Sequence, residues 1–245
     1  MKFLKAEAVV LKASEYKEAD RILTLYSLEY GKIRAISYGS ARPTSKKRGA
    51  VQPFSRSRFF LTREKDLSRV DQAEELEHFQ HIEKDVRRFG LAHYFAELVD
   101  GFTVEGVPNQ PLYLLLVESL RMLNGDSELL TRAFEIRVLA LTGFGPELNC
   151  CVSCRKPLDF QELMAFSPEA GGVLCPVCRQ GVTAAGMLPG TLKTLRRLSE
   201  DSLGRVFTLK PDPAIRTELN GILPATIAFH FGYRPRSLRF LDDLQ

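Results

Sequence analysis

Two pairs of closely spaced cysteines are the residues of this sequence whose types and spacing best suit a chemical role. Cys151 and Cys154 form one C-x2-C pair, Cys175 and Cys178 form a second, and 20 residues separate the two pairs. Thiolates carried on two such turns match a tetrahedral zinc site in ligand type and in spacing. Because four cysteines fill every coordination position, we expect a structural Zn²⁺ ion and no catalytic metal.

Other interpretations of these residues are weaker. Disulfide bonds are disfavoured because we expect a cytoplasmic protein, in which thiols stay reduced. A nucleobase deaminase needs an H-x-E motif near its cysteines; His81 and Glu83 spell that motif, but they lie far upstream and leave the first cysteine pair without a role. Cys150 either replaces Cys151 as a ligand or takes no part in the site.

The composition and the N-terminus support the cytoplasmic location. The 245 residues are 44% hydrophobic and 26% charged, ordinary values for a chain with a packed core. The longest apolar run, residues 112–117, is far shorter than the roughly 20 residues that span a bilayer. Charged residues at Lys2, Lys5 and Glu7 disfavour a signal peptide. We expect no membrane partner.

The first 77 residues have the pattern of short strands. Apolar and β-branched residues favour strands over 6–16, 52–62 and 67–76, and alternation over 21–37 with Gly31 at a turn predicts a hairpin. About five short strands in so short a segment favour a small closed barrel, because closure removes exposed edges.

The remainder of the chain has helical periodicity. Apolar residues recur at three- and four-residue steps over 78–103, 111–124, 127–144, 189–200 and 211–232. The sequence therefore predicts an α+β protein with a barrel domain at 1–77 and a helical domain at 78–245. The cysteines lie in an inserted zinc module at about 148–182.

Positive charge is concentrated in the predicted barrel. From Gly31 to Arg63 there are nine basic residues and no acidic one, although the formal net charge of the whole chain is only +4. Such a local excess attracts polyanions, and a basic loop beside a small barrel is typical of proteins that track single strands. The cations expected to contact nucleic acid are Lys32, Arg34, Arg42, Lys46, Lys47, Arg48, Arg56 and Arg58.

Two further sets of residues are weaker candidates for nucleic-acid contact. The helical cluster Lys193, Arg196 and Arg197 could extend a DNA path or meet an acidic partner, and solvation of a helix surface is the simpler explanation. The barrel aromatics are expected in the core more than on a stacking surface. These aromatics are Tyr38, Phe54, Phe59 and Phe60.

The chain resembles the RecO family of bacterial recombination mediators. The resemblance lies in residues 8–33 (AVVLKASEYKEADRILTLYSLEYGKI), 142–154 (TGFGPELNCCVSC), 166–178 (FSPEAGGVLCPVC) and 229–241 (FHFGYRPRSLRFL). It implies an N-terminal OB-fold before a helical domain with a zinc module. Some members of the family lack the cysteines, which implies that zinc supports the fold.

The same resemblance implies a function without catalysis. Family members bind single- and double-stranded DNA, anneal complementary strands, pair with RecR, and help RecA replace single-strand-binding protein; a nucleoid-associated location follows. The sequence contains no G-x-x-x-x-G-K-[ST] motif, so an ATP-driven mechanism is not expected. An OB-fold, zinc-containing RNA-binding factor would fit the charge equally well, and only the resemblance favours DNA.

Overall fold

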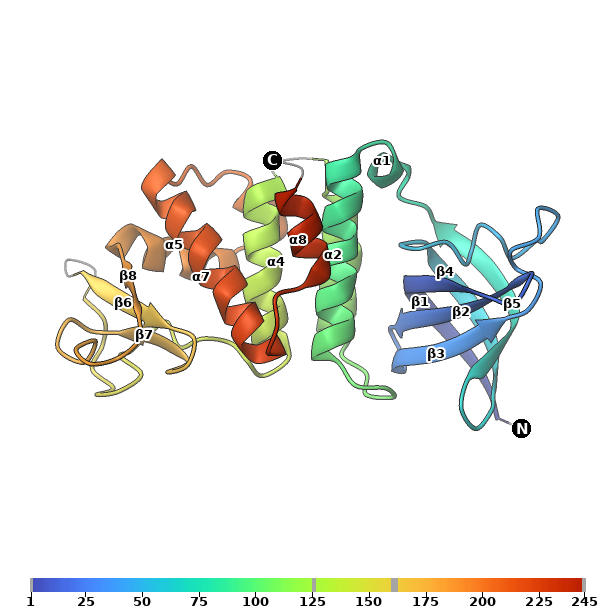
Figure 1. Ribbon diagram of the computed structural model, residues 1–245, viewed down its shortest axis with the longest axis horizontal. Coiled ribbons are helices and arrows are strands. Elements are labelled where there is room, and N and C mark those ends of the chain that lie inside the picture. The colour runs from blue at the N-terminus through green and yellow to red at the C-terminus, as the bar shows by residue number, and fades with distance from the viewer. Residues whose placement is uncertain (1, 125–126, 160–162, 244–245) are drawn as a thin grey trace. The chain divides into compact units, whose positions relative to one another are not determined.

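A closed five-stranded barrel forms the N-terminal part of the protein in the computed structural model, which describes residues 2–124, 127–159 and 163–243 (Figure 1). The strands are β1 (Lys2–Tyr16), β2 (Asp20–Ser27), β3 (Gly31–Ser37), β4 (Arg56–Arg63) and β5 (Ser68–Glu77). Their order around the barrel is β1-β2-β3-β5-β4, and the parallel pairing of β3 with β5 closes it. The predicted barrel and its hairpin turn at Gly31, where φ is +66°, are confirmed.

The barrel core follows from the alternation of side chains along each strand. Leu4, Ala6 and Ala8 of β1 point inward and meet residues such as Phe59 of β4. Small alanines beside one large ring fit the narrow interior of a five-stranded barrel. Val51, which lies in the segment between β3 and β4, also enters this core and ties that segment to the barrel.

Three helices follow the barrel. They are α1 (Gln80–Glu83), α2 (Val86–Phe102) and α3 (Gln110–Arg121). The single helix predicted over 78–103 is wrong in one respect, because Asp85 takes an extended conformation and caps α2 by accepting a hydrogen bond from the Arg88 amide at 2.8 Å. Asn109 caps α3 in the same way through the Leu112 amide.

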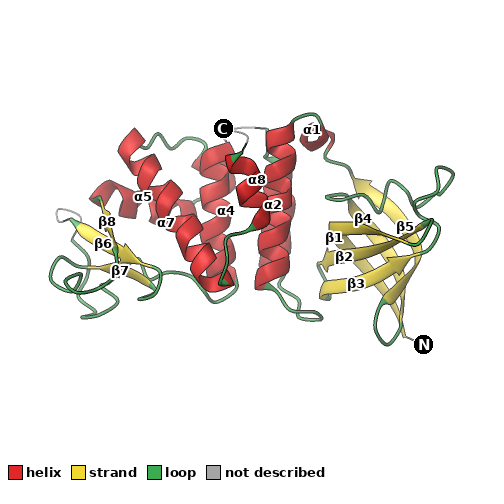
Figure 2. Ribbon diagram, in the orientation of Figure 1, coloured by secondary structure: helices red, strands yellow, loops and turns green. Residues whose placement is uncertain are grey.

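The rest of the chain combines helices with a small sheet (Figure 2). Its helices are α4 (Ser127–Leu141), α5 (Pro189–Glu200), α6 (Leu203–Val206), α7 (Pro213–Phe231) and α8 (Arg236–Asp242). Its strands β6 (Met164–Ser167), β7 (Gly172–Leu174) and β8 (Ala185–Met187) form an antiparallel sheet in the order β7-β6-β8. In the described residues, no helix is long and apolar enough to cross a membrane.

The chain packs as two compact units. One comprises Met1–Asn124 with Phe240–Gln245, and the other comprises Gly125–Arg239. Gly90 of α2 lets the C-terminal segment pack closely in the first unit, because an added Cβ there would lie only 2.8 Å from Leu241 Cδ2. The predicted boundary between the domains 1–77 and 78–245 coincides with the end of β5 at Glu77, and the division into these two domains stays a prediction.

A half-buried ionic network joins the barrel to the helices of the first unit. Arg56 of β4 binds Glu7 at 2.7 Å and Glu77 at 3.1 Å. Arg121 of α3 binds Glu77 at 2.6 Å, and the Tyr113 hydroxyl donates to Glu7 at 3.0 Å. Burial raises the pKa of Glu7, but the hydrogen bonds from Arg56 and Tyr113 outweigh it and lower the pKa overall. The hydrogen bond from Arg121 is the main cause that lowers the pKa of Glu77.

Removing the shared cation of this network should make the free energy of unfolding depend less on pH in the acidic range. We expect Arg56→Met to lower the free energy of unfolding by about 2 kcal/mol at pH 7, because two carboxylates lose a partner. Each carboxylate stabilises the fold fully above its unfolded pKa of about 4.3. That contribution is lost as pH falls through the lower folded pKa, so the difference from the wild type should shrink.

Urea unfolding at pH 7 and at about pH 3 checks this expectation. Arg63→Met is the matched control. Arg63 is exposed, has no carboxylate partner among the described residues, and should change stability by less than about 0.5 kcal/mol. Equal losses for both variants at pH 7 would contradict the structural role of the network.

Candidate metal centre and nucleic-acid interface

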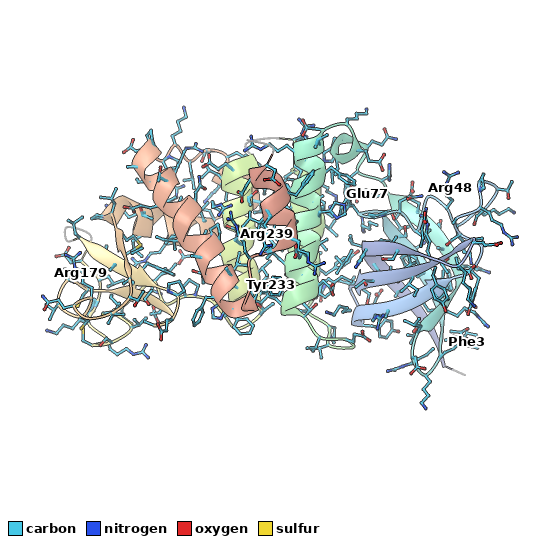
Figure 3. The ribbon with its side chains drawn as sticks, in the orientation of Figure 1. Phe3, Arg48, Glu77, Arg179, Tyr233 and Arg239 are labelled. Atoms are coloured by element: carbon cyan, nitrogen blue, oxygen red, sulfur yellow. The ribbon has the colours of Figure 1, made fainter. Side chains whose placement is uncertain are left out.

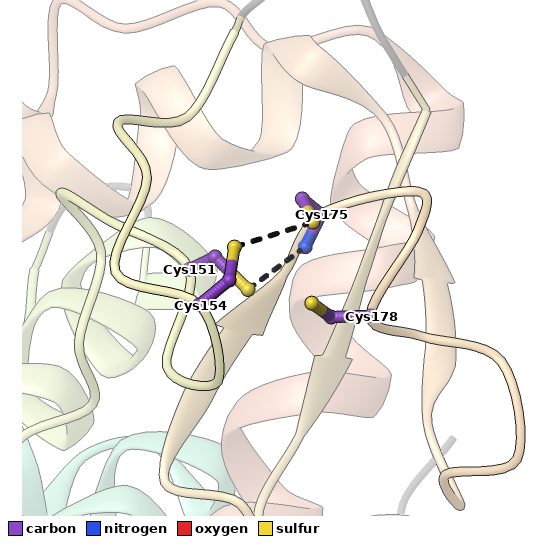
Figure 4. A group of neighbouring side chains, drawn as sticks. All are labelled: Cys151, Cys154, Cys175 and Cys178. Carbon is purple, nitrogen blue, oxygen red and sulfur yellow. Dashed lines mark hydrogen bonds between the residues drawn. The ribbon is translucent and has the colours of Figure 1, made fainter.

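The four cysteines of the two C-x2-C pairs converge beside the small sheet (Figure 4). Their Sγ atoms all lie within 4.8 Å of one another, and Cys154 Sγ lies 3.8 Å from Cys175 Sγ. Two ligands of a tetrahedral zinc ion with Zn–S bonds of about 2.3 Å are separated by about 3.8 Å. None of the five cysteines forms a disulfide. The cluster thus has the ligand type, number and spacing of a metal centre.

Turns on either side of the sheet bring the two pairs together. Cys151 and Cys154 lie in the turn before β6, where the Arg155 amide donates to the Cys151 carbonyl and Arg155 takes a φ of +60°. Cys175 and Cys178 lie in the turn that follows β7. The Val152 amide donates to the Val173 carbonyl at 2.9 Å. This hydrogen bond holds the turn of the first cysteine pair against β7.

Glycine at position 172 is required for this approach. Its φ is +151°, and a Cβ there would collide with the backbone of Glu147. The amides of Glu147 and Val173 instead bond to the carbonyls of Gly171 and Glu147, respectively. Gly171, which precedes it, also has a positive φ of +79°.

The electrostatics of the cluster favour a bound cation. Burial raises the pKa of Cys151, but amide donors from Cys154, Cys175 and Ser153 outweigh it and lower the pKa to about 6. At Cys178 the Ser153 hydroxyl lowers the pKa, but the three other thiols outweigh it and raise the pKa to about 11. Four adjacent thiols cannot all ionise without a compensating charge, and a divalent cation supplies one.

The ligand set decides what such an ion could do. Four thiolates complete a tetrahedron, so the centre has no open position for water or substrate. Cys150 is half-buried, and its amide contacts a Glu147 carboxylate oxygen at 3.4 Å. Cys150 is not part of the metal-type cluster found among the described residues. His81 of the H-x-E motif contacts the Leu120 carbonyl at 2.9 Å and belongs to the other compact unit.

Half of the cations expected to contact DNA are engaged in ion pairs. Lys32 binds Asp100 at 2.9 Å, and its side chain is only 13% exposed. Arg34 lies 4.0 Å from Glu105, and Arg58 binds Glu74 at 3.1 Å. Arg56 belongs to the half-buried network. Lys32 and Arg56 thus hold parts of the first unit together, and sequence reasoning missed that role because their partners are remote in the chain. Arg34 and Arg58 are more exposed, and their surface pairs contribute little to stability.

The other four expected cations lie in the loop of residues 38–55 that joins β3 to β4, here called the basic loop. Arg42, Lys46 and Arg48 are exposed, and no ion pair is recorded for them among the described residues; Figure 3 marks Arg48. Lys47 instead donates to the Val70 carbonyl at 3.2 Å, and burial lowers the pKa of its ammonium.

The basic loop is anchored at its C-terminal end. Val51 enters the barrel core, and the ring of Phe54 packs edge-on against Phe89 of α2 with centroids 5.6 Å apart. The Ala50 carbonyl accepts hydrogen bonds from Ser55 and Ser57. The three exposed cations therefore project from a loop with a fixed base, which limits the entropy lost on binding.

The helical cations predicted as a secondary contact have local partners. Arg196 donates to the Leu148 carbonyl at 2.6 Å and holds α5 against the segment before the first cysteines. Arg197 pairs with Asp201 at 2.9 Å along the same helix. Lys193 lies on the exposed side of α5. A direct role of this cluster in binding DNA stays a prediction.

The aromatic side chains of the barrel divide between core and surface. Phe54 and Phe59 are buried, as expected. Tyr38 and Phe60, which were also expected in the core, are exposed. Phe3 is the most exposed aromatic of the first unit and was not singled out from sequence; strict alternation with Leu4 was the signal that could have found it.

The closed barrel, the helices and the four-cysteine cluster together define an OB-fold protein whose helical part carries a metal-type centre. Two family models match the chain. Recombination protein O N terminal covers residues 1–79, and Recombination protein O C terminal covers residues 83–239. The chain belongs to the RecO family.

Curated relatives agree with this assignment. Proteins named DNA repair protein RecO from Desulforudis audaxviator and Pelotomaculum thermopropionicum are 45% and 42% identical to this chain. The first match covers 100% of this chain and 98% of the relative, and the second covers 99% and 94%. The DNA repair protein RecO of Moorella thermoacetica is 35% identical over 98% of this chain and 90% of its own length. The resemblance noted in the sequence is confirmed.

Proposed function

We propose that this protein binds single- and double-stranded DNA through the basic loop and anneals complementary strands without catalysis. The observation that carries the proposal is the set of three exposed cations, Arg42, Lys46 and Arg48, on an anchored loop of an OB-fold barrel. Membership of a family whose curated relatives are named DNA repair proteins supports DNA as the polyanion.

The physics of annealing requires only a cationic surface. Two complementary strands repel each other through their phosphates, and bound Arg and Lys side chains neutralise that charge while releasing counterions. No base-specific contact is needed, since pairing between the strands supplies the sequence information. The closed four-thiol set offers no open metal position for hydrolysis, which supports a non-enzymatic role.

The metal is assigned a structural role in this proposal. Cys151, Cys154, Cys175 and Cys178 would hold Zn²⁺, which clips two turns that are 20 residues apart in the chain. We further propose that the protein acts with RecR to help RecA replace single-strand-binding protein on DNA. Membership of the RecO family supports these partners.

An annealing assay tests the proposal directly. With two complementary fluorescently labelled oligonucleotides and no ATP, the protein should accelerate duplex formation at low salt, and the acceleration should fall steeply as salt rises. No acceleration over buffer at any salt concentration would refute it. The same assay with RNA strands addresses the alternative of an RNA-binding factor, which would be favoured if RNA pairs were annealed and DNA pairs were not.

A further inference from the structure

Exposed aromatic side chains and a lysine share the outer surface of β1 and β4 at the N-terminal end of β1. Phe3 is 73% exposed and Phe60 is 39% exposed. Lys5 lies opposite Phe60 in the strand register, with its Nζ 5.8 Å from the ring centroid. These three residues are here called the β1–β4 platform, and Figure 3 marks Phe3.

Strand alternation fixes the outward direction of the platform. Leu4 and Leu61 are register partners that both point into the barrel core. Their neighbours Phe3 and Phe60 therefore point out of the barrel. Phe3 and Phe60 thus present ring surface to solvent on the same face of the β1–β4 pair, where a planar ligand can stack.

The unpaired charge of the platform is positive. The acidic side chains nearby are already paired, because Glu74 binds Arg58 at 3.1 Å and Asp71 binds Arg69 at 2.9 Å. Lys5 has no carboxylate partner recorded within residues 2–124, 127–159 and 163–243. Aromatic faces beside an unneutralised cation suit a chain that offers bases and phosphates in alternation.

The opposite side of the barrel cannot offer the same surface. OB-folds commonly bind oligonucleotides over strands 2 and 3. Here α2 packs against β1 and β2, the outward ring of Tyr26 is fully buried, and Lys32 is held by Asp100. Gly31 lies so close to the Val107 carbonyl that no Cβ would fit. The strands usually used for binding are therefore covered within the first unit.

We propose that the β1–β4 platform stacks unpaired bases of single-stranded DNA, with Phe60 and Phe3 as the ring surfaces and Lys5 at the phosphates. The inference rests on the proposed function and adds a site to it. The basic loop attracts single strands and duplexes alike, whereas the platform selects single strands, since duplex bases are already stacked on each other. Single-strand preference and strand pairing thus use different surfaces.

The sequence contains no tryptophan, so a Phe60→Trp variant of the intact protein carries a single fluorescent reporter. Adding oligothymidylate of about 16 nucleotides should quench this fluorescence, whereas a duplex of the same length should not. The matched control is Leu114→Trp, at a position that is 53% exposed on α3, and its fluorescence should not respond to oligothymidylate. Equal responses of both reporters would overturn the proposal.

Affinity measurements complete the test. Phe60→Ala should weaken binding of oligothymidylate about tenfold and leave duplex affinity unchanged. Phe60→Leu keeps an apolar side chain without a π-face and should lose as much. The stacking role would be overturned if Phe60→Leu kept the wild-type affinity for single strands. Equal losses of affinity for single strand and duplex would also overturn it.

The same measurements separate this inference from the proposed function. If the wild type binds neither nucleic acid, the proposed function itself fails. If it binds both and only the basic-loop variants lose affinity, the platform alone is refuted.

Discussion

Cys175→Ala is expected to release the metal ion and unfold the segment that contains the cysteines. A structural zinc ion contributes about 10–16 kcal/mol of apparent binding free energy, which is comparable to the total stability of a domain at about 5–15 kcal/mol. The turns that carry the ligands contain few buried apolar side chains to replace that contribution. Metal analysis of the purified protein should find one equivalent of zinc in the wild type and a large loss in the variant.

Cys150→Ala is the matched control for the metal prediction. It removes a neighbouring thiol outside the four-ligand cluster, so it should retain one equivalent of metal and the wild-type melting temperature. Hydrogen exchange should report the damage of Cys175→Ala in residues 145–187 and leave the barrel amides protected. A Cys175→Ala protein that keeps its metal and its melting temperature would contradict a four-cysteine site.

Reversing the charge of the basic loop is the second change with a large expected effect. Replacing Arg42, Lys46 and Arg48 by Glu should weaken DNA binding by at least about 100-fold near 0.1 M salt, because three phosphate contacts become repulsive. The slope of log affinity against log salt should fall in magnitude by about 2.7, since each lost phosphate contact accounts for about 0.9. Fluorescence anisotropy of a labelled duplex across a salt series measures both quantities.

A control with the same change in net charge separates local contacts from a general electrostatic effect. Lys84 follows the last residue of α1, and Arg87 and Arg88 lie in the first turn of α2, within a segment rich in acidic residues. Their replacement by Glu should change affinity far less. Similar losses in the two triple variants would mean that overall charge, and no specific loop, governs binding.

Patterns that act over a few residues allowed much of the fold to be predicted. Alternation and turn residues gave the five strands and the hairpin at Gly31, and the two C-x2-C pairs indicated the cluster that the structure brings within 4.8 Å. The small sheet of β6, β7 and β8 was missed because strands of three or four residues show too little alternation to recognise.

Pairing over long sequence distances explains why the interface was harder to predict than the fold. Lys32 and its partner Asp100 are 68 residues apart, and Arg56 and Glu7 are 49 residues apart. A count of cations cannot tell those that meet a remote carboxylate from those that remain exposed, such as Arg42 and Arg48. Composition located the positive region, and only the three-dimensional arrangement divides it into structural and accessible residues.

The packing of Leu241 over Gly90 affects how the protein is made. Ribosomes deliver the chain from its first residue onward, and domains usually fold as they emerge. Gly90 stays uncovered by Leu241 until residue 241 has left the exit tunnel, after the whole of Gly125–Arg239. The first compact unit is therefore the first to be translated and the last to be completed, and newly made chains pass through a stage in which this part of α2 is exposed.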